Sequence, residues 1–192
     1  MSVVVAFKYK NGVIMGADKR VTYGWHLKDD IVSKITMTQY TQHGMGSVGD
    51  LLHNNLLHVK DELMDYKDIL DKTEVDLSYM IAHIVPNLKM YLKSCGALSE
   101  ENGVACVPSA FLYCTKDKIF QIGGDFSVIE YPSWGVIGCG EELVTGLLSN
   151  FEDEQLAKLT EQKAIEVMAN CIAYACKKDN AVSENFEVML IK

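Results

Sequence analysis

The chain has 192 residues, of which 48% are hydrophobic, and a formal net charge of −8 at pH 7. A chain of this length buries roughly 70% of its unfolded surface, so we expect a single domain over residues 1–192 that needs no disulfide or metal for stability. The acidic balance and the lack of a basic stripe exclude a nucleic-acid-binding protein, because phosphate contacts require clustered Lys and Arg side chains.

The six cysteines form no CxxC pair and have no histidines at zinc-ligand spacing. The sequence also shows no signal peptide and no apolar run long enough to span a membrane. We therefore expect a reduced, cytoplasmic protein with no structural metal, no cofactor and no membrane contact.

Strands are predicted through the first fifty residues. Val3–Lys10 alternates after an apolar start, and Asn11-Gly12 is a strong hairpin signal before a returning strand at Val13–Ala17. Asp18 directly follows that strand, where a side chain can be aimed rather than buried. Two further short strands are predicted, at Val32–Met37 and Gln42–Met45.

Helical periodicity begins after Val48. The apolar residues of a first helix share one face: Leu52, Leu56, Val59 and Leu63. A second helix is predicted after Thr73, which resembles a capping box with Asp76. Pro86 is expected to kink or split this second helix.

The second half repeats the alternation. Its predicted strands are Ala110–Cys114, Lys118–Ile122, Ser127–Tyr131, Trp134–Gly138 and Phe186–Ile191. Two helices precede the last strand, one over about 141–150 and one with Ala164, Met168, Cys171 and Ala175 on one face. Strand blocks separated by helix pairs predict an α+β fold, a four-layer αββα sandwich of two antiparallel sheets flanked by helix pairs.

Ser2 is the first candidate functional residue. Removal of Met1 would give Ser2 a free α-amino group, whose reference pKa of about 7.7–8.0 suits a general base at neutral pH. Nucleophile and base would then belong to one residue, and no histidine would be required. A methionine followed by a small residue is a good substrate for methionine removal, so no propeptide is needed.

Ser2, Asp18 and Lys34 are each sixteen residues apart. In the segments Ser2–Lys8, Gly12–Thr22 and Val32–Ile35 they resemble the active centre of the N-terminal nucleophile hydrolases, specifically proteasome β subunits and HslV. Taken singly, an Asp at a strand end is usually a turn former and a lone Lys is usually a solvated charge. The family fold implied by the resemblance is the same αββα sandwich.

Three further segments resemble the family pattern. Met45–Asp50 resembles the glycine turn that donates an N–H to the oxyanion, and Val136–Gly140 resembles the Ile-Gly-Ser-Gly turn near the nucleophile. Lys178-Asp179 with Ser183 resembles the Arg-Asp…Ser stretch, with a spacing one residue longer. The glycines could also serve only a tight turn, and Cys139 could be a small core residue.

The resemblance implies a role for each catalytic candidate. Ser2 Oγ would attack a carbonyl carbon, Lys34 would supply positive charge, and Asp18 would orient Lys34. Gly46, at a helix start, would donate its N–H to the oxyanion. Cys139 stands where a serine usually helps to hold the amine, and Asp179 completes the group. By resemblance an uncharged substrate side chain would contact Val21, His43, Gly44, Met45 and Val48.

The implied function is a peptidase that hydrolyses peptide bonds through an acyl ester on Ser2, where the family uses Thr. The partners implied are further copies of this chain in a ring, an ATP-dependent unfoldase and polypeptide substrates. Two alternatives stay open. The chain could be an amidase or transpeptidase that transfers the acyl group to an amine, or a non-catalytic assembly subunit that retains Met1.

Overall fold

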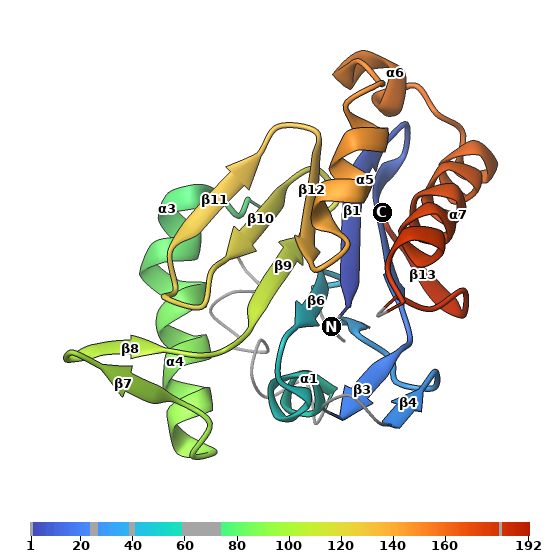
Figure 1. Ribbon diagram of the computed structural model, residues 1–192. Coiled ribbons are helices and arrows are strands. Elements are labelled where there is room, and N and C mark those ends of the chain that lie inside the picture. The colour runs from blue at the N-terminus through green and yellow to red at the C-terminus, as the bar shows by residue number, and fades with distance from the viewer. Residues whose placement is uncertain (1, 24–26, 39–40, 59–73, 181) are drawn as a thin grey trace.

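Two antiparallel sheets lie face to face in the computed structural model, which describes all residues except 1, 24–26, 39–40, 59–73 and 181 (Figure 1). The first sheet has the strand order β12–β1–β2–β13, with bounds Trp134–Gly138, Val3–Tyr9, Gly12–Asp18 and Phe186–Ile191. The second has the order β11–β10–β9–β6–β5, with bounds Val128–Tyr131, Ile119–Ile122, Ala110–Cys114, Gly44–Val48 and Ile35–Met37.

Helices cover the outer face of each sheet (Figure 1). The helices against the first sheet are α5 (Glu141–Leu148), α6 (Asp153–Ala157) and α7 (Glu161–Lys178). The helices beside the second are α1 (Leu51–His58), α3 (Leu77–Tyr79), the π-helical turn η2 (Met80–Ile84) and α4 (Val85–Ser94). Two small hairpins complete the described residues: β3 (Val21–Tyr23) with β4 (Leu27–Asp29), and β7 (Ser99–Glu101) with β8 (Val104–Cys106).

Three apolar layers hold these four layers together. One lies between the sheets and joins side chains such as Val4 and Met15 to Leu112 and Ile119. The others pack the first sheet against α7 and the second sheet against α4. Because each strand presents alternate side chains to opposite faces, both faces of each sheet are apolar. The predicted α+β four-layer αββα sandwich is confirmed.

The α-helix is interrupted directly before Pro86, by a π-helical turn rather than by a loop. Residues 80–84 form a π-helical turn, and α4 begins at Val85 with Pro86 in its first turn. The helical run begins at Leu77 with Asp76 as its N-cap, which accepts the Tyr79 N–H at 2.7 Å. Thr73, Val59 and Leu63 lie outside the described residues.

Strands near the site differ from the sequence prediction in their bounds. The pairing of β5 begins only at Ile35, and β6 runs from Gly44 to Val48 rather than from residue 42 to 45. Residues 30–34 belong to no strand: their backbone is held partly by single bonds to Lys19 and Ser47 and partly by side chains, as described below. The short helix α6 and the two small hairpins were not predicted, since three to five residues carry little periodicity. No described helix has the length and apolarity that a membrane crossing requires.

A half-buried histidine at the start of β6 predicts loss of stability in acid. His43 Nδ1 lies 2.6 Å from the Tyr113 hydroxyl, and burial lowers the pKa of His43 from 6.5 to about 4. As pH falls from 6.5 to 4 the unfolded chain gains a proton that the folded chain excludes, which costs no more than about 3 kcal/mol. Urea unfolding of wild type and His43→Gln is expected to show a smaller acid loss in the variant; equal losses would contradict this assignment.

Candidate active site

Asp18 is the central acceptor of the site and is 0% exposed at the end of β2. Its Oδ1 accepts the Val3 N–H at 2.9 Å and Lys34 Nζ at 2.8 Å. Its Oδ2 accepts the N–H groups of Arg20 and Ser183 at 3.0 and 3.3 Å. A buried carboxylate is costly unless it is paired and hydrogen-bonded, and these four donors meet that condition.

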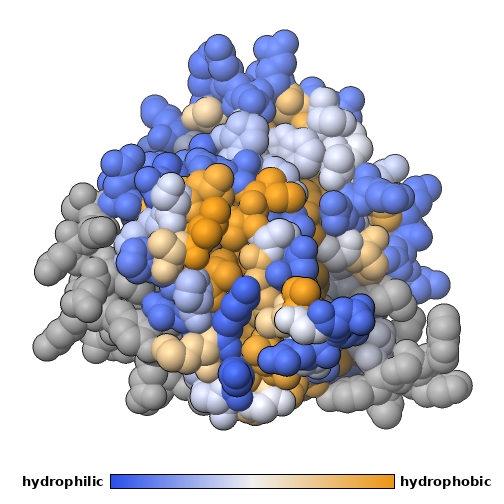
Figure 2. Space-filling view, turned by 90° about the vertical axis from the view of Figure 1, so that its left-hand side faces the viewer, coloured by the Kyte–Doolittle hydropathy of each residue, from blue (hydrophilic) through white to orange (hydrophobic). Residues whose placement is uncertain are grey.

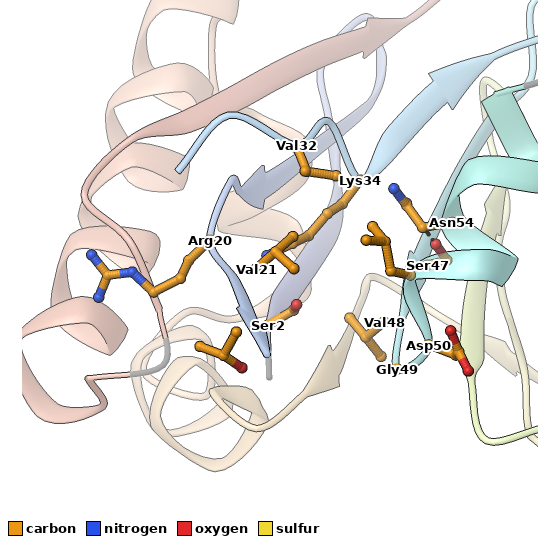
Figure 3. Close-up of a pocket in the computed structure, with 12 residues that line it drawn as sticks. Ser2, Arg20, Val21, Val32, Lys34, Ser47, Val48, Gly49, Asp50 and Asn54 are labelled. Carbon is orange, nitrogen blue, oxygen red and sulfur yellow. Dashed lines mark hydrogen bonds between the residues drawn. The ribbon is translucent and has the colours of Figure 1, made fainter. Parts of the chain in front are cut away.

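Lys34 stands just before β5 and is 4% exposed. Burial lowers its pKa, while the charge of Asp18 and its hydrogen bond oppose that shift. Because Lys34 Nζ and the Val3 N–H share one oxygen of Asp18, the ammonium lies beside the peptide that joins Ser2 to Val3. Figure 3 shows the Lys34 side chain extending towards Val21 and Ser2.

Ser2 precedes β1 and is 7% exposed, at the wall of a pocket of about 270 Å³. Lys34 and Val21 line the same pocket, as do Val48 and Gly49 (Figure 3). The structure thus brings together Ser2, Asp18 and Lys34, which are separated by sixteen residues each in the sequence.

Cys139 and Asp179 meet on the other side of Ser2. The Cys139 thiol donates to the Ser2 carbonyl oxygen at 3.3 Å. Desolvation of the thiol, together with a hydrogen bond to Asp179 and the charge of that carboxylate, raises the pKa of Cys139 to about 11. The thiol is therefore protonated at neutral pH, and Cys139 contacts both the Ser2 carbonyl and Asp179.

Gly46 does not lie at a helix start, and this part of the sequence prediction is wrong. It lies inside β6, paired with Ile35 on one side and Leu112 on the other. An added Cβ would lie 2.7 Å from Val4, so the residue faces the layer between the sheets. The glycine that lines the Ser2 pocket is Gly49, at the turn into α1.

Three of the five predicted substrate-contacting residues lie away from this pocket. His43 and Gly44 are at the opposite end of β6, and Met45 is 2% exposed within the core under α4. Val21 and Val48 do line the pocket. The prediction failed because the β6 register was placed too early, and a strand's side chains change face at every residue.

The sequence prediction missed the polar residues of the pocket and its rim. Ser47 and Asn54 are both buried, and Ser47 Oγ donates to Asn54 Oδ1 at 2.9 Å (Figure 3). Asn54 Nδ2 donates to the Ser33 carbonyl at 2.8 Å, which ties α1 to the segment before Lys34. The remaining lining residues that were missed are Arg20, Thr22, Val32, Asp50 and Leu51. No pairwise spacing in the sequence signals these contacts.

A buried serine and a buried histidine hold the backbone of the Gly49 turn in place. Ser109 Oγ accepts the Asp50 N–H at 2.9 Å and lies 2.8 Å from His53 Nδ1. His53 Nε2 lies 2.8 Å from the Ala97 carbonyl, so it must carry the proton, and Nδ1 accepts from Ser109. The backbone entering α1 is thereby fixed next to Ser2.

Replacement of Gly49 by alanine is expected to destabilise the fold and the site. Gly49 has φ of +115°, and an added Cβ would lie 2.3 Å from the Pro108 carbonyl oxygen. We expect a loss of about 3 kcal/mol in urea unfolding. The control is Gly146→Ala in α5, where no atom lies within 4 Å of the new Cβ; helix propensity predicts a gain of about 0.5–1 kcal/mol there. A Gly49→Ala variant with the same unfolding stability as wild type would contradict the turn geometry.

The sequence of this chain matches a known protein family. A family model described as "Proteasome subunit" matches residues 2–191. No curated protein matches.

Solved structures share the fold at low sequence identity. HslV from Trypanosoma brucei has a TM-score of 0.69 at 12% identity, with 99% of both chains covered. Thiobacillus denitrificans BPH in complex with epoxomicin has a TM-score of 0.73 at 17% identity, also covering 99% of both chains. Anbu from Hyphomicrobium sp. strain MC1 has a TM-score of 0.69 at 14% identity, covering 99% of this chain and 82% of Anbu. Because the family model spans nearly every residue, the chain belongs to the proteasome subunit family.

Proposed function

We propose that this protein is a proteasome-like peptidase whose nucleophile is Ser2, exposed as an N-terminal residue by removal of Met1. One observation carries the proposal: Asp18 Oδ1 holds the Lys34 ammonium and the Val3 N–H together, beside Ser2 and at the wall of a pocket. A solvated lysine and a surface turn would not share a buried carboxylate. The family membership and the fold of the solved neighbours support the same chemistry.

The residues suggest the following sequence of steps. Ser2 Oγ attacks the carbonyl carbon of the scissile peptide bond while the Ser2 α-amine, through a water, accepts the hydroxyl proton. The resulting oxyanion accepts a hydrogen bond from the Gly49 N–H, which we assign to this role in place of Gly46. The tetrahedral adduct expels the amine product, which takes up the proton, and leaves an ester on Ser2. Water then hydrolyses this ester with the α-amine again as base.

The charge of Lys34 favours both the neutral amine and the oxyanion. A positive charge nearby lowers the pKa of an amine and stabilises a developing negative charge. Asp18 keeps the ammonium in place, since a buried ammonium without a partner is costly.

The pocket next to Ser2 fits an uncharged substrate side chain. Its charged groups already have partners: Lys34 pairs with Asp18, Arg20 pairs with Asp30, and the Asp50 carboxylate accepts the Leu52 N–H at 2.8 Å. In Figure 3 the Arg20 guanidinium points away from Ser2. Val21, Val48 and Leu51 supply apolar surface. Fluorogenic peptides that differ only in the residue before the cleaved bond test this: Leu or Ala should be cleaved in preference to Arg or Glu.

A covalent probe tests the nucleophile directly. BPH was crystallised in complex with epoxomicin, so epoxomicin is the first probe to apply. After expression in cells, intact mass should show the loss of one methionine, and incubation with epoxomicin should add the inhibitor mass on Ser2. Retained Met1 together with no adduct would refute the peptidase and indicate a non-catalytic assembly subunit. Peptide products carrying an added amine would indicate acyl transfer rather than hydrolysis.

We further propose that copies of this chain assemble into a ring, with an ATP-dependent unfoldase supplying polypeptide in the cytoplasm. The side of the molecule that carries α3 and α4 presents apolar residues gathered near its middle (Figure 2). Exposed large hydrophobic residues on α3, η2, α4 and the adjacent β11 are Leu77, Ile81, Met90 and Ile129. Such clustering on a soluble surface marks a protein contact.

The assembly is expected to depend on this apolar side. Ile81 and Met90 are each 56% exposed, so Ile81→Glu with Met90→Glu should leave the monomer fold intact and shift it to lower mass in analytical ultracentrifugation. Lys116→Glu on the β9–β10 turn is the control and should not change the mass. An unchanged assembly in the double variant would place the contact elsewhere.

A further inference from the structure

Pairing with β6 holds only one end of the Lys34 peptide backbone. The residues from 30 to 34 between β4 and β5 belong to no strand, although the Lys34 carbonyl accepts the Ser47 N–H of β6 at 3.0 Å. The Lys34 N–H is not part of that pairing and takes its acceptor from elsewhere, and its position matters because the ammonium at the end of a flexible side chain has to meet Asp18 beside Ser2. One carboxylate from the last strand, Glu187 of β13, reaches this segment.

Glu187 binds three consecutive residues around Lys34. Its Oε1 accepts the Lys34 N–H at 2.7 Å and lies 3.4 Å from the Ile35 nitrogen. The Ser33 hydroxyl donates to both carboxylate oxygens, at 2.9 and 2.7 Å. The Glu187 side chain is 18% exposed, and Lys19 Nζ approaches its outer oxygen at 3.8 Å. A mostly buried carboxylate with several donors makes charge-assisted hydrogen bonds of the stronger kind.

Strand register brings Glu187 and Asp18 to the two ends of one residue. In the β2–β13 pair, Phe186 lies opposite Asp18 and Glu187 lies opposite Ala17. Asp18 then accepts from the side-chain end of Lys34, and Glu187 accepts from its backbone end. Two carboxylates of the first sheet thus hold Lys34, which directly precedes β5 of the second sheet, at its side-chain end and at its backbone N–H.

We infer that Glu187 is a positioning residue for Lys34: its carboxylate fixes the backbone of residues 33–35 and adds negative charge near the buried ammonium. This inference rests on the proposed function, in which Lys34 acts beside Ser2. Neither composition nor motif spacing singles out Glu187, which is 153 residues from Lys34 in the chain.

The negative charge of Glu187 also affects the pKa of Lys34. The titratable groups that face Lys34 are Asp18 from β2, Glu187 from β13, the Cys139 thiol after β12 and Asp30 from the preceding segment. Removal of Met1 would add the Ser2 amine to them. Burial lowers the pKa of Lys34, and the charge of Glu187 is among the influences that raise it. Loss of that charge should let Lys34 lose its proton at lower pH.

Two variants separate the backbone contact from the charge. Glu187→Gln keeps an oxygen that can accept from Lys34 and Ser33 but removes the charge, whereas Glu187→Ala removes both. Glu130→Gln on β11 is the matched control. Glu130 makes one long ion pair, with Lys118 at 3.9 Å, and contacts none of the described site residues. With fluorogenic peptides, Glu187→Ala should lower kcat at least about tenfold with KM changed less than about threefold.

The pH profile gives the decisive readout. Glu187→Gln should retain most of kcat near neutrality but shift the alkaline limb of kcat to lower pH, while Glu130→Gln should follow wild type. An unmoved alkaline limb in Glu187→Gln, or wild-type kcat in Glu187→Ala, would overturn the inference. If Glu187→Ala does not fold, the Glu187→Gln profile still decides.

A second measurement does not depend on activity. The Lys34 amide should be protected from hydrogen exchange in wild type and Glu187→Gln and should lose protection in Glu187→Ala. If wild type forms no epoxomicin adduct, the proposed peptidase fails while this exchange test still stands. Equal protection in Glu187→Ala and wild type would refute the positioning role whatever the activity.

Discussion

Substitution of Ser2 by alanine is expected to abolish peptide hydrolysis, lowering kcat by at least about 10⁴-fold. The reason is chemical: the variant retains the α-amine, the Lys34–Asp18 pair and the pocket but has no atom that can form the ester. Ser2 is 7% exposed and alanine is smaller by one oxygen, so the fold should change in stability by less than about 1 kcal/mol. Single-turnover hydrolysis of a fluorogenic peptide and urea unfolding measure the two quantities.

Ser2→Thr is the matched variant for this test. It keeps the hydroxyl and adds a methyl group that restricts the side-chain rotamer. Its kcat should stay within about tenfold of wild type, and epoxomicin should still add to it. If Ser2→Ala retained hydrolysis at a level comparable with Ser2→Thr, the ester on Ser2 would not be an intermediate and the nucleophile would have to be sought elsewhere.

The group of Ser2, Asp18 and Lys34 was more predictable than the pocket around it. The hairpin that carries Ser2 and Asp18 is a local signal, and the family resemblance of the surrounding segments joined Lys34 to them. Gly46 was misassigned because two glycines lie three residues apart, and only the β6 register shows that Gly49 makes the turn.

The side chains that support the site could not be predicted from the sequence. Glu187 meets Lys34 across 153 residues, a contact that depends on how the two sheets are placed against each other. Ser109 precedes β9 and meets the Gly49 turn through the pairing of β9 with β6, which lie 59 residues apart at this contact. Single polar residues carry no periodicity that would reveal such long-range pairs. The four layers were predictable because many apolar residues contribute to each face, whereas each of these contacts depends on one side chain.

Removal of either member of the Asp18–Lys34 pair is the second change with a large expected effect. Asp18→Asn leaves a 4% exposed ammonium without a charged partner and should cost about 3–5 kcal/mol in urea unfolding. Lys34→Met should cost less, since the Asp18 carboxylate keeps three backbone N–H donors from Val3, Arg20 and Ser183. Both variants should lose kcat by about 10³-fold, because each removes the ordered positive charge.

A double variant measures the interaction between Asp18 and Lys34. Asp18→Asn with Lys34→Met buries no charge, so its loss of stability should be smaller than the sum of the two single losses by at least about 1 kcal/mol. Its hydrolysis should stay as low as in the single variants, since catalysis needs the ammonium itself. Strictly additive losses would show that the two charges do not stabilise each other.

The pH dependence of the unfolding stability of Asp18→Asn tests the protonation of Lys34. Burial already lowers the pKa of Lys34 below 10.5, and loss of the Asp18 charge should lower it further. Between that lowered pKa and 10.5 the unfolded chain binds more protons than the folded one, so the stability of Asp18→Asn should rise with pH through this window. The Lys34→Met double variant has no such proton to lose and should show no corresponding rise. A rise of equal size in both would assign the titration to another group and would contradict a further lowering of the Lys34 pKa.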